Sequence, residues 1–149
     1  MMLRWLLATI HLLALPLGLG AVWARGRALR ATRSAADLPR AFLADNLWGL
    51  AAVLWIATGL VRAFGGFEKG ASYYLNDAMF QLKMGLLVLV LLLEIWPMVM
   101  LVRWRIALRR GAAIDTAAAH TLGQISAIEA LLVVLMVFAA TAVARGYLY

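Results

Sequence analysis

The chain of 149 residues contains no cysteine, and it has only two histidines, three prolines and 14% charged residues. Without cysteine there is no disulfide, no thiolate nucleophile and no cysteine-ligated zinc or iron–sulfur cluster. The sequence also lacks a glycine-rich phosphate loop, a serine nucleophile elbow and an HExxH helix. These absences exclude the familiar motif-bearing enzymes of the aqueous phase, and they leave open whether the protein is an enzyme at all.

What the chain does contain is hydrophobic residues, at 66%, which is too many for a soluble domain of this length. They are gathered into four long blocks rather than spaced along one face of a helix, so the lipid bilayer is the expected solvent. A helix rises ~1.5 Å per residue, so a block of ~20 residues crosses a ~30 Å hydrocarbon core. The sequence therefore predicts an all-α integral membrane four-helix bundle with no extramembrane domain.

Helix boundaries follow from capping residues and flanking charges, and they predict a single transmembrane domain over residues 1–149. Asp37 followed by Pro39 is typical of a helix start, and either Asn76 or Asp77 can cap the third helix. The expected helices cover about residues 3–24, 38–64, 77–102 and 122–145, with a headgroup-region loop over 65–76.

The cationic residues are distributed unevenly, and this distribution predicts an orientation. The net charge is +7, and nine of the fourteen Lys and Arg residues lie in the connections 25–40 and 103–121. By the positive-inside rule these connections are cytoplasmic, which places both termini and the 65–76 loop outside. We therefore expect an N-out, C-out protein of the bacterial inner (cytoplasmic) membrane. Arginines in short loops are explained by membrane orientation and by contact with anionic lipid headgroups, so no nucleic-acid partner is predicted.

Ionisable residues also lie inside the apolar blocks, where each costs ~2.5–3.5 kcal/mol on insertion scales and usually faces a bundle interior. His11, Lys83 and Arg62 lie toward the expected outer face and form a candidate cofactor-binding cluster. His11, Gly18 and Arg25 follow one another at intervals of seven residues, so they share one helix face. The simpler alternatives are that the lysine extends to the outer interface and that the histidine only packs against a neighbouring helix.

Glu94, Glu129 and Asp45 lie toward the expected cytoplasmic face and form a candidate polar interior. Carboxylates at one depth on different helices of a small bundle can meet in its centre. The alternative is that the two glutamates pair only with loop arginines such as Arg103 or Arg40. The sequence therefore predicts two buried polar groups at different depths.

Haem is the cofactor to consider, because a histidine in a four-helix bundle can serve as an axial ligand. The second histidine, His120, falls in the cytoplasmic connection before the last helix, so one subunit cannot form a bis-histidine site. The sequence permits a haem b on His11 with Lys83, Met79 or no protein ligand on the other side. No bare metal site is predicted, because zinc lacks enough ligands at one point and copper lacks a thiolate.

Most of the chain resembles a bacterial family of small four-helix inner-membrane proteins that is catalogued as a domain of unknown function. The resemblance lies in HLLALPLGLGAVWARGRALR, ADNLWGLAAVLWIATGLVR, EKGASYYLND, FQLKMGLLVLVLLLEIWPM and AATAVARGYLY. It implies the fold and the membrane location.

A second resemblance is to the HemJ-type protoporphyrinogen oxidases and the CopD-like membrane proteins. Those proteins place a histidine in helix one and a lysine early in helix three, and His11 and Lys83 are the corresponding positions. This resemblance implies haem b and porphyrin or quinone chemistry. The chain departs from it at Glu94, where a second histidine is expected.

Three classes of function are compatible with these features. Small-residue stripes, interfacial aromatic residues and the lack of an aqueous domain favour an accessory or structural subunit of a larger membrane complex. Its contacts would be lipid and either a membrane-protein partner or further copies of the chain. The first alternative is a haem- or quinone-linked redox protein that uses His11 and Lys83. The second is an oligomeric conduit for protons, ions or small solutes that uses Glu94, Glu129 and Lys83.

Overall fold

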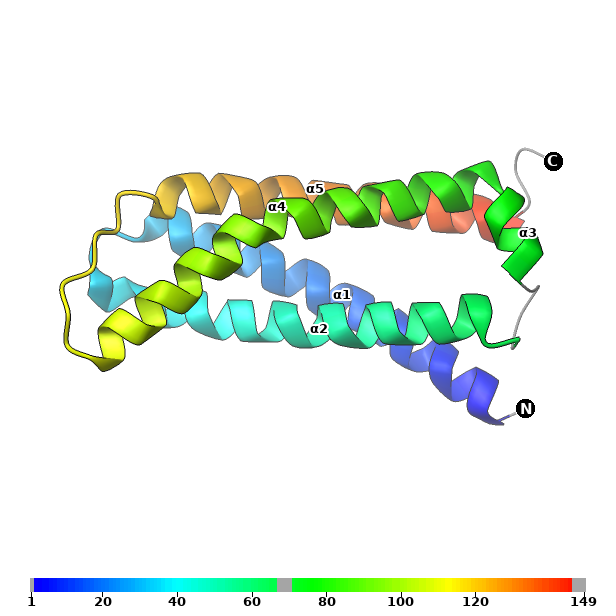
Figure 1. The fold of residues 1–149 in the computed structure, drawn as a ribbon, viewed down its shortest axis with the longest axis horizontal. Helices are drawn as coiled ribbons and strands as arrows, with labels where there is room; N and C mark the ends of the chain where they lie inside the picture. Colours follow the sequence, from blue (N-terminus) through cyan, green and yellow to red (C-terminus); the bar gives the residue numbers. More distant parts are fainter. Residues whose placement is uncertain (1, 67–70, 146–149) are drawn as a thin grey trace.

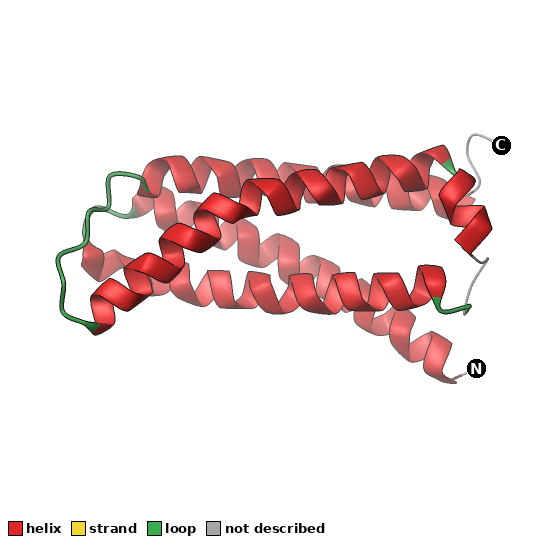
Figure 2. Cartoon of the chain, viewed as in Figure 1, coloured by secondary structure: helices red, strands yellow, loops and turns green. Residues whose placement is uncertain are grey.

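The computed structural model describes residues 2–66 and 71–145, which fold into a bundle of helices (Figures 1 and 2). The helices are α1 (Met2–Ala31), α2 (Leu38–Phe64), α3 (Ala71–Asn76), α4 (Ala78–Arg109) and α5 (Ala119–Arg145), with a 3-10 turn at Ala35–Asp37. Four of them, α1, α2, α4 and α5, are long and apolar enough to cross a membrane. The predicted all-α, four-helix membrane architecture is confirmed.

The four long helices are not packed evenly around the bundle. α1 packs against both α2 and α5, and α4 packs against α5. The connections from α1 to α2 and from α4 to α5 lie at one end, and α3 lies at the other end with both termini (Figure 1). α4 runs from the side of α5 at the α3 end toward α2 at the connection end (Figure 1). The space between α2 and α4 therefore widens toward α3.

Two helices continue further at their C-terminal ends than the sequence predicts, and α5 begins at Ala119, so that His120 lies in the helix and not in the connection before it. α1 continues to Ala31 and α4 continues to Arg109, whereas ends near residues 24 and 102 were expected. The expectation treated the first arginines as loop residues, but arginine is a good helix former. α1 ends before a turn in which the Asp37 carboxylate accepts the Ser34 backbone N–H at 3.1 Å. α4 ends before Gly111, whose φ of 65° is left-handed.

The other helix starts follow local capping. α2 begins at Leu38 beside the expected proline, and Asp77 caps α4 by accepting the Phe80 backbone N–H at 2.9 Å. The expected loop over 65–76 is wrong at its end, because residues 71–76 form α3. The Asn76 side chain donates to the Ser72 carbonyl at 2.8 Å inside this short helix. The remaining loop residues 67–70 lie outside the described part of the chain.

The buried apolar side chains form three clusters along the bundle. The middle cluster contains Ala21, Val22, Trp48, Val90, Ala130, Leu132, Val133 and Met136. The connection-end cluster contains Leu29, Leu38, Ala41, Leu101, Trp104, Ala119 and Leu122. The cluster nearest α3 contains only Ala63, Phe80 and Val143. The core is therefore smallest where α2 and α4 are farthest apart.

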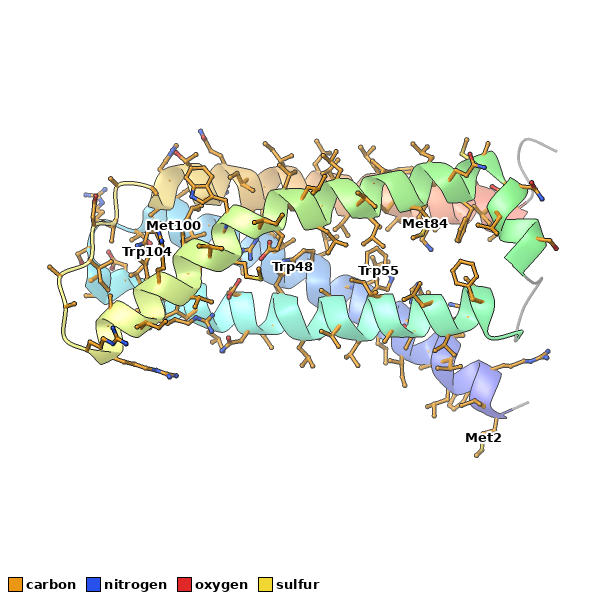
Figure 3. The ribbon with its side chains drawn as sticks, in the orientation of Figure 1. Met2, Trp48, Trp55, Met84, Met100 and Trp104 are labelled. Atoms are coloured by element: carbon orange, nitrogen blue, oxygen red, sulfur yellow. The ribbon has the colours of Figure 1, made fainter. Side chains whose placement is uncertain are left out.

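Glycines bring α1 and α5 into backbone contact near the connection end. A Cβ atom built on Gly123 would lie 2.9 Å from the carbonyl oxygen of Gly26, closer than side chains tolerate. Such small-residue contacts are the usual way for helices to approach closely in a membrane. Large apolar side chains point outward along the long helices, while Trp55 projects between α2 and the neighbouring helices (Figure 3).

Candidate functional site

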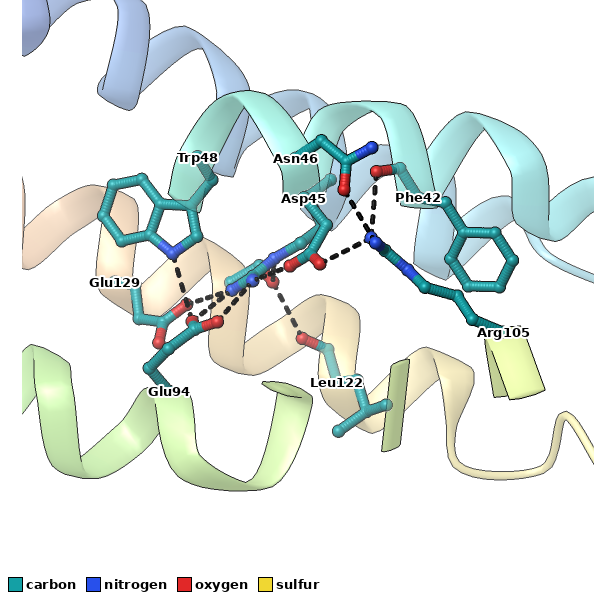
Figure 4. A network of polar contacts seen from close by, with 10 residues as sticks. Phe42, Asp45, Asn46, Trp48, Glu94, Arg105, Leu122 and Glu129 are labelled. Atoms are coloured by element: carbon teal, nitrogen blue, oxygen red, sulfur yellow. Dashed lines mark hydrogen bonds and ion pairs between the residues drawn. The ribbon is translucent and has the colours of Figure 1, made fainter. Parts of the chain in front are cut away.

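The first candidate site is built around Arg25 on α1, whose side chain is 0% exposed. Its Nε donates to Ser126 Oγ at 3.0 Å. Nη1 donates to Asp45 Oδ1 at 2.8 Å and to Glu94 Oε1 at 2.7 Å. Nη2 donates to Glu94 Oε2 and to Glu129 Oε2, both at 2.7 Å (Figure 4). Every N–H of the guanidinium is thus engaged, and one side chain connects all four long helices.

A second arginine extends this network toward the connection end. Arg105 on α4 donates Nη2–H to Asp45 Oδ2 at 2.7 Å and Nη1–H to Asn46 Oδ1 at 2.7 Å. Its guanidinium also lies over the Phe42 ring, 5.0 Å from the centroid. These contacts hold α4 against α2 at the end where the two helices approach. We refer to Arg25, Asp45, Glu94, Arg105 and Glu129 as the Arg25 cluster.

The structure brings together the three carboxylates that the sequence grouped by depth, but it gives them a different partner. The alternative that Glu94 and Glu129 pair with connection arginines is right in kind, but the arginine is Arg25 rather than the examples given, Arg103 and Arg40. Arg25 was itself counted among the cations of a cytoplasmic connection. That assignment is wrong, because α1 continues to Ala31 and the side chain of Arg25 is buried in the bundle.

Two further polar partners were not expected from the sequence. Trp48 is one of the aromatic residues that the sequence assigned to the membrane interfaces, but it is buried and donates its Nε1–H to Glu94 Oε2 at 3.1 Å. Ser126 is buried on α5, and its hydroxyl group donates a hydrogen bond to the Leu122 carbonyl at 3.1 Å. The hydroxyl oxygen therefore accepts from Arg25. The sequence placed Arg25 on the same helix face as His11 and Gly18 but did not identify its partners on the other helices.

The second candidate site is a cavity of about 460 Å³ toward the α3 end of the bundle. The three basic residues that the sequence grouped together line it from three helices: His11 from α1, Arg62 from α2 and Lys83 from α4. Its remaining surface is mostly apolar, with Trp55 on one side and Thr141 of α5 on another. The cavity, which we call the His11 cavity, thus combines a mostly apolar wall with three basic side chains.

Thr58 is a hydrogen-bond partner of His11 and favours one arrangement of its ring protons. The Thr58 hydroxyl oxygen lies 2.6 Å from the Leu54 carbonyl oxygen, an acceptor, which favours directing its one proton there. The same oxygen lies 2.9 Å from His11 Nδ1 and can then accept from an Nδ1–H group. In a neutral ring with its proton on Nδ1, the lone pair is on Nε2. The histidine ring also lies beside the Trp55 ring, with the centroids 5.7 Å apart.

A glycine provides the space for this histidine. A Cβ atom built on Gly59 would lie 3.1 Å from His11 Cε1, tighter than ordinary side-chain contact. The absence of a side chain at position 59 therefore allows the imidazole to lie close against α2. The ring is fixed by Thr58 on one side and by the bare helix surface on the other.

The ligand sets in the bundle suit some cofactors better than others. Among the described residues no three His, Asp or Glu side chains are grouped so that they could hold a metal ion. Haem iron needs only one protein ligand, which His11 can supply. His120 is exposed in the first turn of α5, far from the part of α5 that lines the cavity. Met79 packs against Ala63 and Phe80 instead of lining the cavity.

A narrower cavity of about 50 Å³ lies between the His11 cavity and the Arg25 cluster. Trp55 lines both cavities, and Leu87 and Glu94 line the narrower one. The two candidate sites are therefore neighbours along the bundle axis, with this narrower cavity between them.

Comparison with known proteins gives one match. The model of a family described as "Predicted membrane protein (DUF2214)" matches residues 3–147. Neither the curated proteins nor the solved structures include a match. The resemblance to a family of unknown function is thus confirmed, while none of these comparisons supports the one to HemJ-type or CopD-like proteins.

Proposed function

Because the chain belongs to the DUF2214 family of predicted membrane proteins, we propose that it acts within the bilayer, as a redox protein that binds haem b in the His11 cavity. The observation that carries this proposal is the convergence of three basic side chains on one apolar cavity. Cofactor sites are typically apolar cavities of ~300–1,000 Å³ with a few placed polar groups. The volume of about 460 Å³ lies within this range.

Each basic residue has a distinct role in this proposal. His11 would supply the protein ligand to the iron through Nε2, because the Thr58 contact holds the other ring nitrogen and orients the ring. Arg62 and Lys83 would bind the propionate groups, which are carboxylates. Haem, when bound, supplies one-electron chemistry, and the protein supplies binding, orientation and the electrostatic environment.

The geometry favours this function over the two other classes. A conduit through Glu94 and Glu129 would have to separate carboxylates that share one fully engaged guanidinium. Breaking such a buried pair is costly, so these residues are poor steps for a passing ion. An accessory subunit, which the sequence favoured, needs no cavity with convergent basic side chains. The cavity therefore changes the preferred function from packing to ligand binding.

We also propose the N-out, C-out orientation in a bacterial inner membrane. Its support is the gathering of exposed arginines at the connection end of the bundle, which the positive-inside rule places in the cytoplasm. These are Arg27, Arg33, Arg40, Arg103, Arg109 and Arg110. In this orientation the His11 cavity lies toward the outer leaflet.

The proposal is tested by titrating the detergent-purified protein with hemin and following the Soret band. We expect saturable binding by the wild type and by His120→Ala, which keeps the cavity intact. His11→Ala should lose the ligand-dependent Soret shift. Arg62→Gln and Lys83→Gln should each weaken binding about 10- to 100-fold, because a hydrogen bond to a charged group contributes ~1.5–3 kcal/mol.

Two results would overturn the haem assignment. One is a folded wild-type protein that shows no saturable Soret shift. The other is a His11→Ala variant that binds hemin with wild-type affinity and an unchanged spectrum. Co-purification of the haem-free protein with a stoichiometric membrane partner would instead support an accessory subunit.

A further inference from the structure

The formal charges of the Arg25 cluster do not balance. Asp45, Glu94 and Glu129 contribute three carboxylates, while Arg25 and Arg105 contribute two guanidinium groups. These are charged groups from all four long helices. The nearby Arg30 on α1 donates its Nη1–H to the backbone carbonyl of Gly123 instead. With every acid ionised the cluster carries one net negative charge, which a low-dielectric interior strongly disfavours.

Two of the three carboxylates are well compensated as anions. Each oxygen of Asp45 accepts from an arginine, at 2.8 Å from Arg25 and at 2.7 Å from Arg105. Both oxygens of Glu94 accept from Arg25 at 2.7 Å, and one of them also accepts from the Trp48 indole at 3.1 Å. Each of these two carboxylates therefore accepts at least two hydrogen bonds from arginine, and these bonds stabilise its ionised form.

Glu129 is different from the other two acids. Its side chain is 0% exposed, and only Oε2 accepts a hydrogen bond, from Arg25 at 2.7 Å. Its other oxygen, Oε1, is buried and has no hydrogen-bond partner within the described part of the chain. The nitrogen that binds Oε2 is also shared with Glu94. Glu129 is thus the carboxyl group that gains least from being ionised.

We propose that the Arg25 cluster is a proton-binding site and that Glu129 carries the proton at neutral pH. The proton comes from water and binds a carboxylate oxygen, while Asp45 and Glu94 stay ionised against the two arginines. The cluster is then electrically neutral inside the bilayer. This inference concerns the connection-end half of the bundle, and it does not depend on what occupies the His11 cavity.

The proposal is tested by infrared spectroscopy of the detergent-purified protein at neutral pH. A protonated carboxyl group has a C=O stretching band that an ionised carboxylate lacks, and the band shifts in deuterated water. We expect this band in the wild type and in Glu94→Gln, and we expect it to be absent in Glu129→Gln. A wild type without the band would overturn the proposal. So would a band that persists in Glu129→Gln and disappears in Glu94→Gln.

Thermal unfolding of the same variants gives an independent test. Glutamine has the shape and neutrality of a protonated glutamate, so Glu129→Gln should change the melting temperature by less than ~2–4 °C. Glu94→Gln removes an ionised partner of Arg25 and should lower it by more. If Glu129→Gln instead melts far below Glu94→Gln, Glu129 is the essential anion and the assignment is refuted. Should one variant fail to fold, the other still decides, because the band has to persist in Glu94→Gln and be absent from Glu129→Gln.

Discussion

Replacing Arg25 by methionine should destabilise the bundle more than any other single change to a charged residue. The substitution keeps an apolar side chain of comparable length but removes every hydrogen bond that the guanidinium makes to Asp45, Glu94, Ser126 and Glu129. Asp45 retains Arg105, at 2.7 Å. The two glutamates lose their only arginine among the described contacts.

The magnitude follows from the cost of leaving a buried charge without its partner. Removing one member of a buried ion pair costs ~3–5 kcal/mol. For a chain of this size, 1 kcal/mol corresponds to ~2–4 °C in melting temperature, so the expected drop is roughly 6–20 °C. The assay is size-exclusion chromatography of detergent-solubilised protein after heating. Arg27→Met is the matched control, because Arg27 lies on the same helix but is exposed.

Compensating substitutions separate the charge effect from the packing effect. If the loss comes from an uncompensated carboxylate, adding Glu94→Gln to Arg25→Met should recover much of the stability, and adding Glu129→Gln should contribute little, because Glu129 is already neutral. Replacement of a whole buried ionic group by neutral residues is often tolerated. An Arg25→Met protein that melts within ~2 °C of Arg27→Met would show that the Arg25 cluster is not a structural centre.

Four glycine substitutions test the helix packing by melting temperature and the cavity by hemin binding. Gly123→Ala should lower the melting temperature, because its Cβ would lie 2.7 Å from the Arg30 side chain. Gly49→Ala, which has nothing within 4 Å, should raise it slightly, since alanine is favoured over glycine in a helix by up to ~1 kcal/mol. An equal effect of the two substitutions would refute close α1–α5 packing. Gly59→Ala should weaken hemin binding by displacing His11, whereas Gly85→Ala, in open space, should leave the affinity unchanged.

The number of spanning helices could be predicted because it depends on block length alone. Four apolar blocks had to become four helices, since the hydrocarbon core offers no hydrogen-bond partners and the backbone groups of a helix satisfy one another. The ends of α1 and α4 could not be predicted from charge, because arginine is compatible with both helix and loop. The helix over residues 71–76 could not be predicted either, because a helix of this length is too short to show a periodic pattern of apolar residues.

The candidate sites were predictable in part. Residues at one depth on different helices meet in a narrow bundle, so grouping by depth brought Glu94 and Glu129 together. Arg25 was missed because an arginine at the end of an apolar block has the same sequence signature whether it turns inward or enters a loop. Its position depends on acids from three other helices, a relation that no local pattern contains. The cavity depends on the divergence of α2 and α4, which is equally non-local.

A reduced-minus-oxidised absorption spectrum tests whether His11 and its cavity hold haem. The protein should be extracted from membranes of cells well supplied with haem and purified without added hemin. We predict a Soret band that shifts on dithionite reduction in the wild type and is absent from a folded His11→Ala variant. A colourless, folded wild-type protein from the same membranes would contradict the claim.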